Sequence, residues 1–153
     1  MIRKLMILAG VFILFQFGFS KIDMKEWQKH KEDLLNSEIT AEEAYQELVE
    51  ADSLGYDFYN IYLNVLLKQT NSEQLLEKVF ENSKTNAGRI VVLQGIYEKN
   101  SKKYKELKNK LNGEVTIFYG CYSVPENAKE YIEKIEKLHI NKGGNKWEIN
   151  YWF

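Results

Sequence analysis

Three side chains in this sequence could take part in nucleophilic catalysis: the single cysteine, Cys121, and the two histidines, His30 and His139. A cysteine nucleophile needs a base within hydrogen-bond reach and a third group that orients the base. No spacing between these residues supplies that geometry. Cys121 also follows a glycine in an apolar stretch, where a cysteine is more often a small buried hydrophobic residue. We therefore expect no catalytic residue, and the alternative is a small hydrolase that uses Cys121 with His139 or His30.

The sequence gives little support to metal or cofactor chemistry. Two histidines and one distant cysteine do not make a usual zinc site, and the sequence has no H-E-x-x-H or C-x-x-C spacing. Carboxylates are dense between residues 42 and 52, but they fall on the polar side of an amphipathic pattern. A solvated helix face explains them better than an acid–base pair. We expect no metal site and no cofactor.

Arg89, Trp147 and Trp152 are the candidate binding residues. Arg89 lies at the start of an apolar segment, where a guanidinium must be paired or reach solvent. We expect it to clamp a carboxylate or carbonyl group rather than to bind a free anion, because buried charges need partners. Trp147 and Trp152 belong to an alternating segment whose rings could contact a sugar or a partner protein. Alternation places the two rings on opposite faces of the segment, so at most one of them is expected at the surface. Packing in the core is therefore favoured over binding.

The only basic concentration in the chain lies between residues 99 and 110. It could attract an anionic partner such as nucleic acid, but Tyr104, Leu107 and Leu111 form an inner stripe, which makes the lysines the solvated side of a helix. The whole chain has 21 basic and 22 acidic residues, a formal net charge of -1. Nucleic-acid binders depend on clustered positive charge, so we expect no nucleic-acid partner. The lysines are Lys99, Lys102, Lys103, Lys105, Lys108 and Lys110.

The first twenty residues have the pattern of an export signal. Arg3 and Lys4 are followed by a charge-free stretch at 5–19, and Gly18 and Ser20 supply small residues at positions -3 and -1 of a cleavage site. A fifteen-residue helix is about 22 Å long, short of the roughly 30 Å hydrocarbon core of a membrane. We therefore predict a signal peptide at 1–20, with an uncleaved membrane anchor as the alternative.

Cleavage after Ser20 would leave residues 21–153 as the mature protein. No cysteine lies near the cleavage site, so a lipoprotein anchor has no attachment point, and we expect no stable membrane insertion after cleavage. The mature chain is long enough for a single globular domain with its own core. The expected location is the periplasm or the exterior of the cell.

Helical spacing of apolar residues recurs in six segments between Asp23 and Gly113. Thr40 and Glu43 form a capping box, the clearest helix start in the chain. The segment 57–69 is apolar on nearly all sides and should be the central helix. The run 90–93 could be a strand by propensity, but its residues also fall on a helical stripe, and we predict a helix. Asn112 with Gly113 is typical of a helix end.

The pattern changes at Glu114. Residues 114–124 alternate with period two and predict a strand, Pro125 suits the first turn of a following helix, and residues 146–153 alternate again. We predict that this last segment is a second strand, paired with the first. The expected fold is therefore α+β and mainly α: about six stacked antiparallel helices over 21–113, followed by a strand-helix-strand unit over 114–153.

Three features follow one another from Ala87 onward: Ala87-Gly88-Arg89 at the start of a helix rich in Leu, Gly and Tyr, Tyr104 in a Lys-rich helix, and a strand that ends in Gly120-Cys121. In these features the chain resembles a family of uncharacterised exported bacterial proteins and lipoproteins. No activity is known for that family. The resemblance covers about half of the mature chain and implies the fold and export.

The absence of a reactive constellation and the abundance of Tyr and Trp favour a binding role. We expect an exported, non-catalytic bacterial protein that binds another macromolecule, either a protein or another component of the cell envelope. An inhibitor or immunity-type protein is a special case of that role. The alternative from a different class is the small envelope hydrolase with Cys121 and a histidine.

Overall fold

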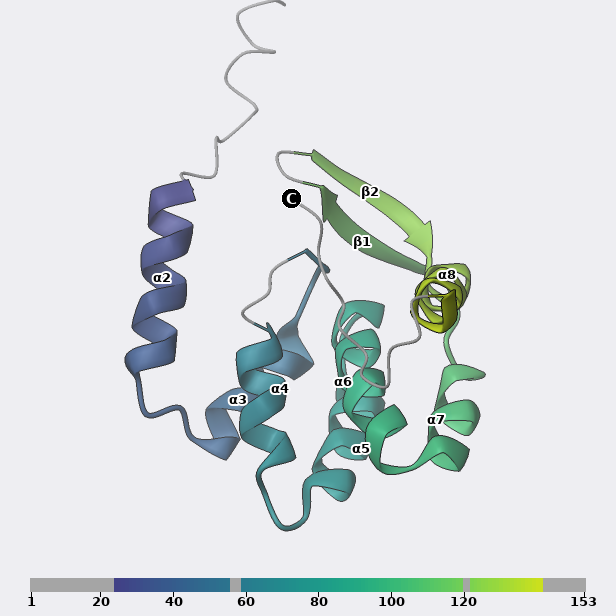
Figure 1. The fold of residues 1–153 in the computed structure, drawn as a ribbon, viewed down its shortest axis with the longest axis horizontal. Helices are drawn as coiled ribbons and strands as arrows, with labels where there is room; N and C mark the ends of the chain where they lie inside the picture. The colour runs from purple at the N-terminus through teal and green to yellow at the C-terminus, as the bar shows by residue number, and fades with distance from the viewer. Residues whose placement is uncertain (1–23, 56–58, 120–121, 142–153) are drawn as a thin grey trace, which may run out of the picture.

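The structure is a computed structural model that describes residues 24–55, 59–119 and 122–141. Within these residues it contains seven helices and a two-stranded antiparallel sheet, so the predicted α+β, mainly helical fold is confirmed (Figure 1). No described helix is long and apolar enough to span a membrane. The elements are α2 (Met24–Asn36), α3 (Ala41–Glu50), α4 (Tyr59–Leu67), α5 (Ser72–Asn82), α6 (Asn86–Lys99), α7 (Ser101–Lys108), β1 (Glu114–Tyr119), β2 (Tyr122–Asn127) and α8 (Ala128–Asn141).

Helix α6 is the centre of the core. It contacts α3, α4, α5, α7, α8 and β1, and the four consecutive residues of 90–93 are all buried. Only a helix covered on every side can bury four residues in a row, which explains why this segment also has the composition of a strand. The prediction of a helix here is confirmed. The prediction that the segment 57–69 is the central helix is wrong.

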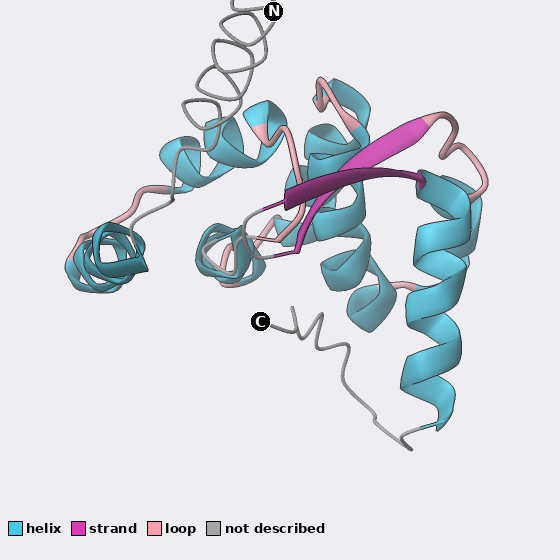
Figure 2. Cartoon of the chain, turned by 90° about the horizontal axis from the view of Figure 1, so that it is seen from above, coloured by secondary structure: helices cyan, strands magenta, loops and turns pink. Residues whose placement is uncertain are grey.

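Helix α4 lies beside the central helix and buries only part of the predicted face. Of the apolar residues expected to point inward, Tyr62 and Leu66 are buried, whereas Ile61 and Val65 are half-buried. Tyr59 and Leu63 are buried in addition. The pattern could not define the buried side, because apolar residues surround nearly the whole circumference of this helix. Helix α2 stands away from the other helices in both views (Figures 1 and 2).

Helix starts follow the local sequence closely. The Thr40 backbone N–H donates to the Glu43 carboxylate at 2.8 Å, and the Glu43 N–H donates to the Thr40 hydroxyl at 3.2 Å, so the predicted capping box is present. Asn100 caps α7 by accepting from the Lys103 N–H at 3.0 Å. Helix α7 ends at Lys108, before the predicted stop at Asn112 and Gly113, although Gly113 has the left-handed φ of +73° that the stop requires.

The capping box allows a prediction about the pKa of Glu43. Hydrogen bonds from the Thr40 backbone and side chain lower the pKa of the Glu43 carboxyl below its ordinary value. Because the folded-state pKa is lowered, the box stabilises the fold at pH above the unfolded-state pKa and loses this contribution as pH falls through the folded-state pKa. Thr40→Ala removes the side-chain hydrogen bond and leaves the backbone one, so the pKa of Glu43 should rise part of the way toward its ordinary value. Carboxyl NMR titration measures this shift, and an unchanged pKa in the variant would contradict the assignment.

The predicted single strand over 114–124 is wrong, because two strands form a hairpin there. β1 pairs antiparallel with β2, from Glu114 opposite Asn127 to Tyr119 opposite Tyr122. In the sequence, alternation continues on both sides of residue 120, so the pattern alone cannot distinguish one long strand from two short ones. Figure 1 shows the hairpin beyond one end of α6, with α8 following directly from β2.

Pro125 lies in β2, which corrects its predicted place in the first turn of a helix. Helix α8 starts three residues later, where the Asn127 side chain accepts from the backbone N–H groups of Lys129 and Glu130 at 3.1 Å. Asparagine is among the strongest N-cap residues, and it outweighs the helix-start signal of the proline. On α8, Ala128 and Ile132 are fully buried, as the apolar stripe predicts.

The predicted strand 146–153 and the signal peptide 1–20 lie outside the described residues. Within the described residues both edges of β1 are in use, because β2 pairs along one edge and Leu54 binds to the other. Leu54 donates its N–H to the Thr116 carbonyl at 2.8 Å and accepts from the Phe118 N–H at 2.7 Å, opposite the edge that pairs with β2. A further strand beside β1 at these residues would have to displace Leu54.

Candidate binding surface

Arg89 is a structural clamp at the joint between α5 and α6. Its guanidinium donates to the backbone carbonyls of Phe80 at 3.3 Å and Ser83 at 3.1 Å, and to the Asn86 side-chain oxygen at 3.2 Å. The two carbonyls belong to the C-terminal turn of α5 and the residue after it, where helical carbonyls lack partners within the helix. The carbonyl clamp expected from the sequence is confirmed, and it explains how a guanidinium is kept among apolar residues.

Asn86 is a buried polar residue that the sequence reasoning missed. Its side-chain nitrogen donates to the carbonyls of Asn112 at 2.6 Å and Glu114 at 3.0 Å, while its oxygen accepts from Arg89. It therefore joins the start of α6 to the start of β1. The only signal in the sequence is a polar residue at the first position of an otherwise apolar helix, and this does not reveal its distant carbonyl partners.

Gly88 is required by the close approach of α3 to α6. A Cβ atom at this position would overlap the carbonyl oxygen of Leu48 and would lie 2.7 Å from the Ser83 hydroxyl. Ala87, its neighbour, is also fully buried. The Ala87-Gly88-Arg89 motif therefore has a packing role: a small residue and a glycine admit α3, and the arginine clamps α5.

The lysine-rich helix α7 is held to α5 and α8 by ion pairs. On the α5 side, Lys103 lies 3.1 Å from Glu77, and Lys110 lies 3.2 Å from Glu81. A hydrogen bond of 2.6 Å between Asn100 and Glu73 extends the same row of contacts. Acidic residues of α5 thus neutralise part of the basic stretch, while Lys99, Lys102 and Lys105 are exposed.

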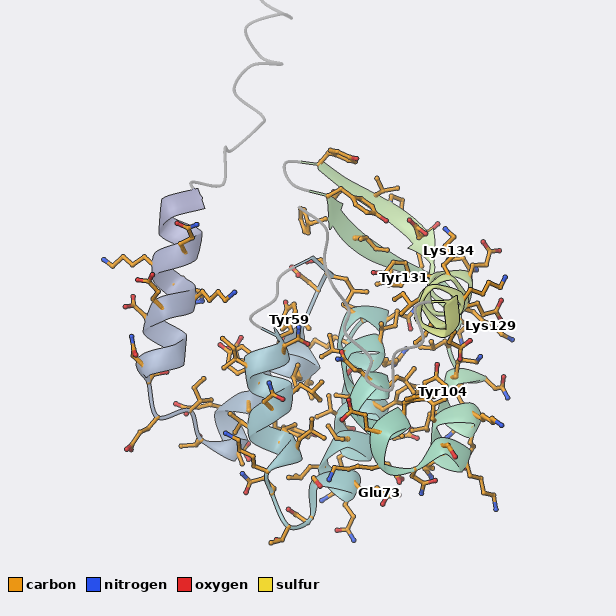
Figure 3. All side chains as sticks on the ribbon, viewed as in Figure 1. Tyr59, Glu73, Tyr104, Lys129, Tyr131 and Lys134 are labelled. Atoms are coloured by element: carbon orange, nitrogen blue, oxygen red, sulfur yellow. The ribbon has the colours of Figure 1, made fainter. Side chains whose placement is uncertain are left out.

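A second polar cluster, which includes the Tyr104 labelled in Figure 3, fixes α8 to α7. The Tyr104 hydroxyl donates to Glu136 at 2.7 Å, and the Lys108 ammonium donates to both oxygens of the same carboxylate at 2.9 Å. Burial, reinforced by the hydrogen bond to Glu136, raises the pKa of Tyr104 far above its ordinary value. The phenol therefore stays protonated and acts as a donor, which gives the cluster a structural role.

Among the side chains that the structure describes, the two most exposed large aromatic ones lie at the turn end of the hairpin. Tyr122 is 56% exposed and Tyr119 is 38% exposed, and their rings are stacked with centroids 5.9 Å apart. The Tyr119 hydroxyl donates to Glu126 at 2.9 Å, and Lys134 of α8 lies 2.6 Å from the other oxygen of that carboxylate. We call Tyr119, Tyr122, Glu126 and Lys134 the tyrosine surface.

Electrostatics at the tyrosine surface keep its charged pair ionised. The hydrogen bond from Lys134 lowers the pKa of the Glu126 carboxyl, and the same contact raises the pKa of Lys134. Beside them, burial raises the pKa of Tyr131, whose side chain is labelled with that of Lys134 in Figure 3. The tyrosine surface thus combines two exposed rings with one compensated ion pair.

The tyrosine surface was not predicted from the sequence. A single strand would have placed Tyr119 and Tyr122 on opposite faces, whereas residues directly opposite each other in a hairpin share a face. The other candidate residues, Cys121, Trp147 and Trp152, lie outside the described residues. His139 belongs to α8, but its side chain is not among those described. Among the described residues, no group of histidine, cysteine and carboxylate side chains could hold a metal ion.

Comparisons with protein-family models, with curated proteins and with solved structures find no match to this chain.

Proposed function

We propose that this chain is an exported, non-catalytic bacterial protein that binds another protein or component of the cell envelope through the tyrosine surface. The observation that carries the proposal is the exposed, stacked pair of Tyr119 and Tyr122. Most described apolar side chains are buried in one core, and these two are the clearest exception. Export rests on the signal pattern of residues 1–20 and on the resemblance to uncharacterised exported proteins.

The geometry of the surface supports a binding role in two ways. Tyrosine is enriched in the well-packed centres of protein interfaces, where a large rigid side chain contributes most of the binding energy. The Tyr119 ring is already held in place by Tyr122 and by its hydrogen bond to Glu126, so less side-chain freedom is lost when a partner binds. The Glu126–Lys134 pair provides a polar rim beside the rings.

Affinity capture from the native cell envelope, followed by mass spectrometry, tests the proposal. We expect one stoichiometric partner, and Tyr122→Ala should weaken its binding about 30-fold, a value typical of an interface hot spot. Titration of the purified partner by calorimetry measures the change.

Tyr97→Ala is the matched control, because Tyr97 is 37% exposed and lies on α6 against Tyr104 of α7. This variant should bind as tightly as the original protein. If the captured partner binds Tyr122→Ala as tightly as the original protein, the tyrosine surface is not the binding site. Failure to capture any partner, together with turnover of an envelope substrate that alkylation of Cys121 abolishes, would replace the binding role with the hydrolase alternative.

A further inference from the structure

Strand β2 has an outer edge whose backbone groups point away from β1. Ser123 lies opposite Phe118, and Pro125 lies opposite Thr116. Phe118 and Thr116 use their backbone N–H and C=O groups to bind Leu54 on the far side of β1. In an antiparallel pair, when a residue of one strand points its N–H and C=O away from the other strand, the residue directly opposite it does the same. Ser123 and Pro125 are therefore the residues whose backbone faces the outer edge.

Among residues 24–55, 59–119 and 122–141, no strand pairs with this outer edge, and such an edge is a template for another strand. A second copy of the chain presents the same edge and could pair with it. Ser123 and Pro125 are both exposed, and Figure 1 shows β2 as the outer strand of the hairpin. Two β2 strands related by a two-fold axis would pair antiparallel. One such register places Ser123 of each copy opposite Pro125 of the other. Two residues that face each other in this way normally form two backbone hydrogen bonds, one from each N–H, and residue 125 would need an N–H to form its own.

We infer that Pro125 prevents this chain from pairing with a second copy of itself through β2. Proline has no backbone N–H, so half of the hydrogen bonds in that register cannot form, and the proline ring occupies the space where the other strand would approach. The same proline leaves the β1–β2 ladder intact, because its missing N–H would have pointed outward. This role is independent of the proposed binding function.

Pro125→Thr restores the outward N–H and tests the inference. The original protein should sediment as a monomer, and the variant should dimerise at least about 30-fold more tightly, as expected for two regained hydrogen bonds. Analytical ultracentrifugation over a concentration series measures the dimerisation constant. Pro125→Ala restores the same N–H with a smaller side chain and serves as a second test if the threonine variant folds poorly.

Two control variants separate the regained N–H from other effects. Ser123→Thr raises strand propensity on the same edge without adding a donor, so it should stay monomeric. Adding Ser123→Pro to Pro125→Thr removes the other outward N–H, so the double variant again has one outward donor per strand in this register, as the original protein does, and should be monomeric. The inference is overturned if both Pro125 variants fold and remain monomeric, or if the original protein already forms a dimer that Ser123→Pro dissociates.

Discussion

Gly88→Ala is expected to lower the free energy of unfolding by about 3 kcal/mol, the upper end of the range for overpacking substitutions. The added methyl group would overlap the Leu48 carbonyl oxygen, and this obstacle is backbone of α3 rather than the flexible end of a side chain. Alanine gains about 1 kcal/mol of helix propensity over glycine, which does not offset the separation of α3 from α6. Thermal unfolding followed by circular dichroism should show a midpoint lower by about 10 °C.

Gly95→Ala is the matched control on the same helix. A Cβ atom there would meet side-chain methyl groups of Leu76, Leu67 and Leu63 at 3.0–3.2 Å, and such groups can shift by a few tenths of an ångström. The gain in helix propensity offsets this strain, so the net change should stay within about 1 kcal/mol. Equal losses in the two variants would contradict the close approach of α3 to α6 at Gly88.

The features that sequence predicted correctly depend on short-range patterns. Thr40 and Glu43 are three residues apart, and their mutual hydrogen bonds need nothing beyond the first turn of α3. The helix over 90–93 was also predictable, because the flanking residues extend the helical stripe on both sides. In each case the residues that determine the structure lie within about two turns of one another.

The features that sequence missed depend on contacts between distant segments. Tyr119 and Tyr122 became a stacked pair only because the chain reverses between them, and alternation is the same before and after that reversal. Pro125 carried a valid helix-start signal, but a strand edge tolerates proline equally well when the missing N–H points outward. Local patterns give the type of an element, whereas the turn and the register decide which side chains meet.

Asn86→Ala is the second substitution with a large expected effect, because one side chain satisfies groups from three segments. Its removal deprives the carbonyls of Asn112 and Glu114 of donors and leaves an Arg89 N–H without its acceptor. Asn86 is only 6% exposed, so water replaces few of these bonds. Buried groups left unsatisfied cost about 1–3 kcal/mol each, and we expect a total loss of about 3 kcal/mol after relaxation.

Urea unfolding of Asn86→Ala and of Asn82→Ala provides the comparison. Asn82 makes one side-chain hydrogen bond, to the Tyr45 hydroxyl at 2.7 Å, and it is exposed, so its loss should cost less than about 1 kcal/mol. Asn86→Asp should also be destabilising, because a carboxylate cannot donate to either carbonyl and would place a negative charge beside both carbonyl oxygens. If Asn86→Asp instead retained the original stability, Arg89 alone would hold the joint between α5, α6 and β1, since a carboxylate still accepts the guanidinium bond.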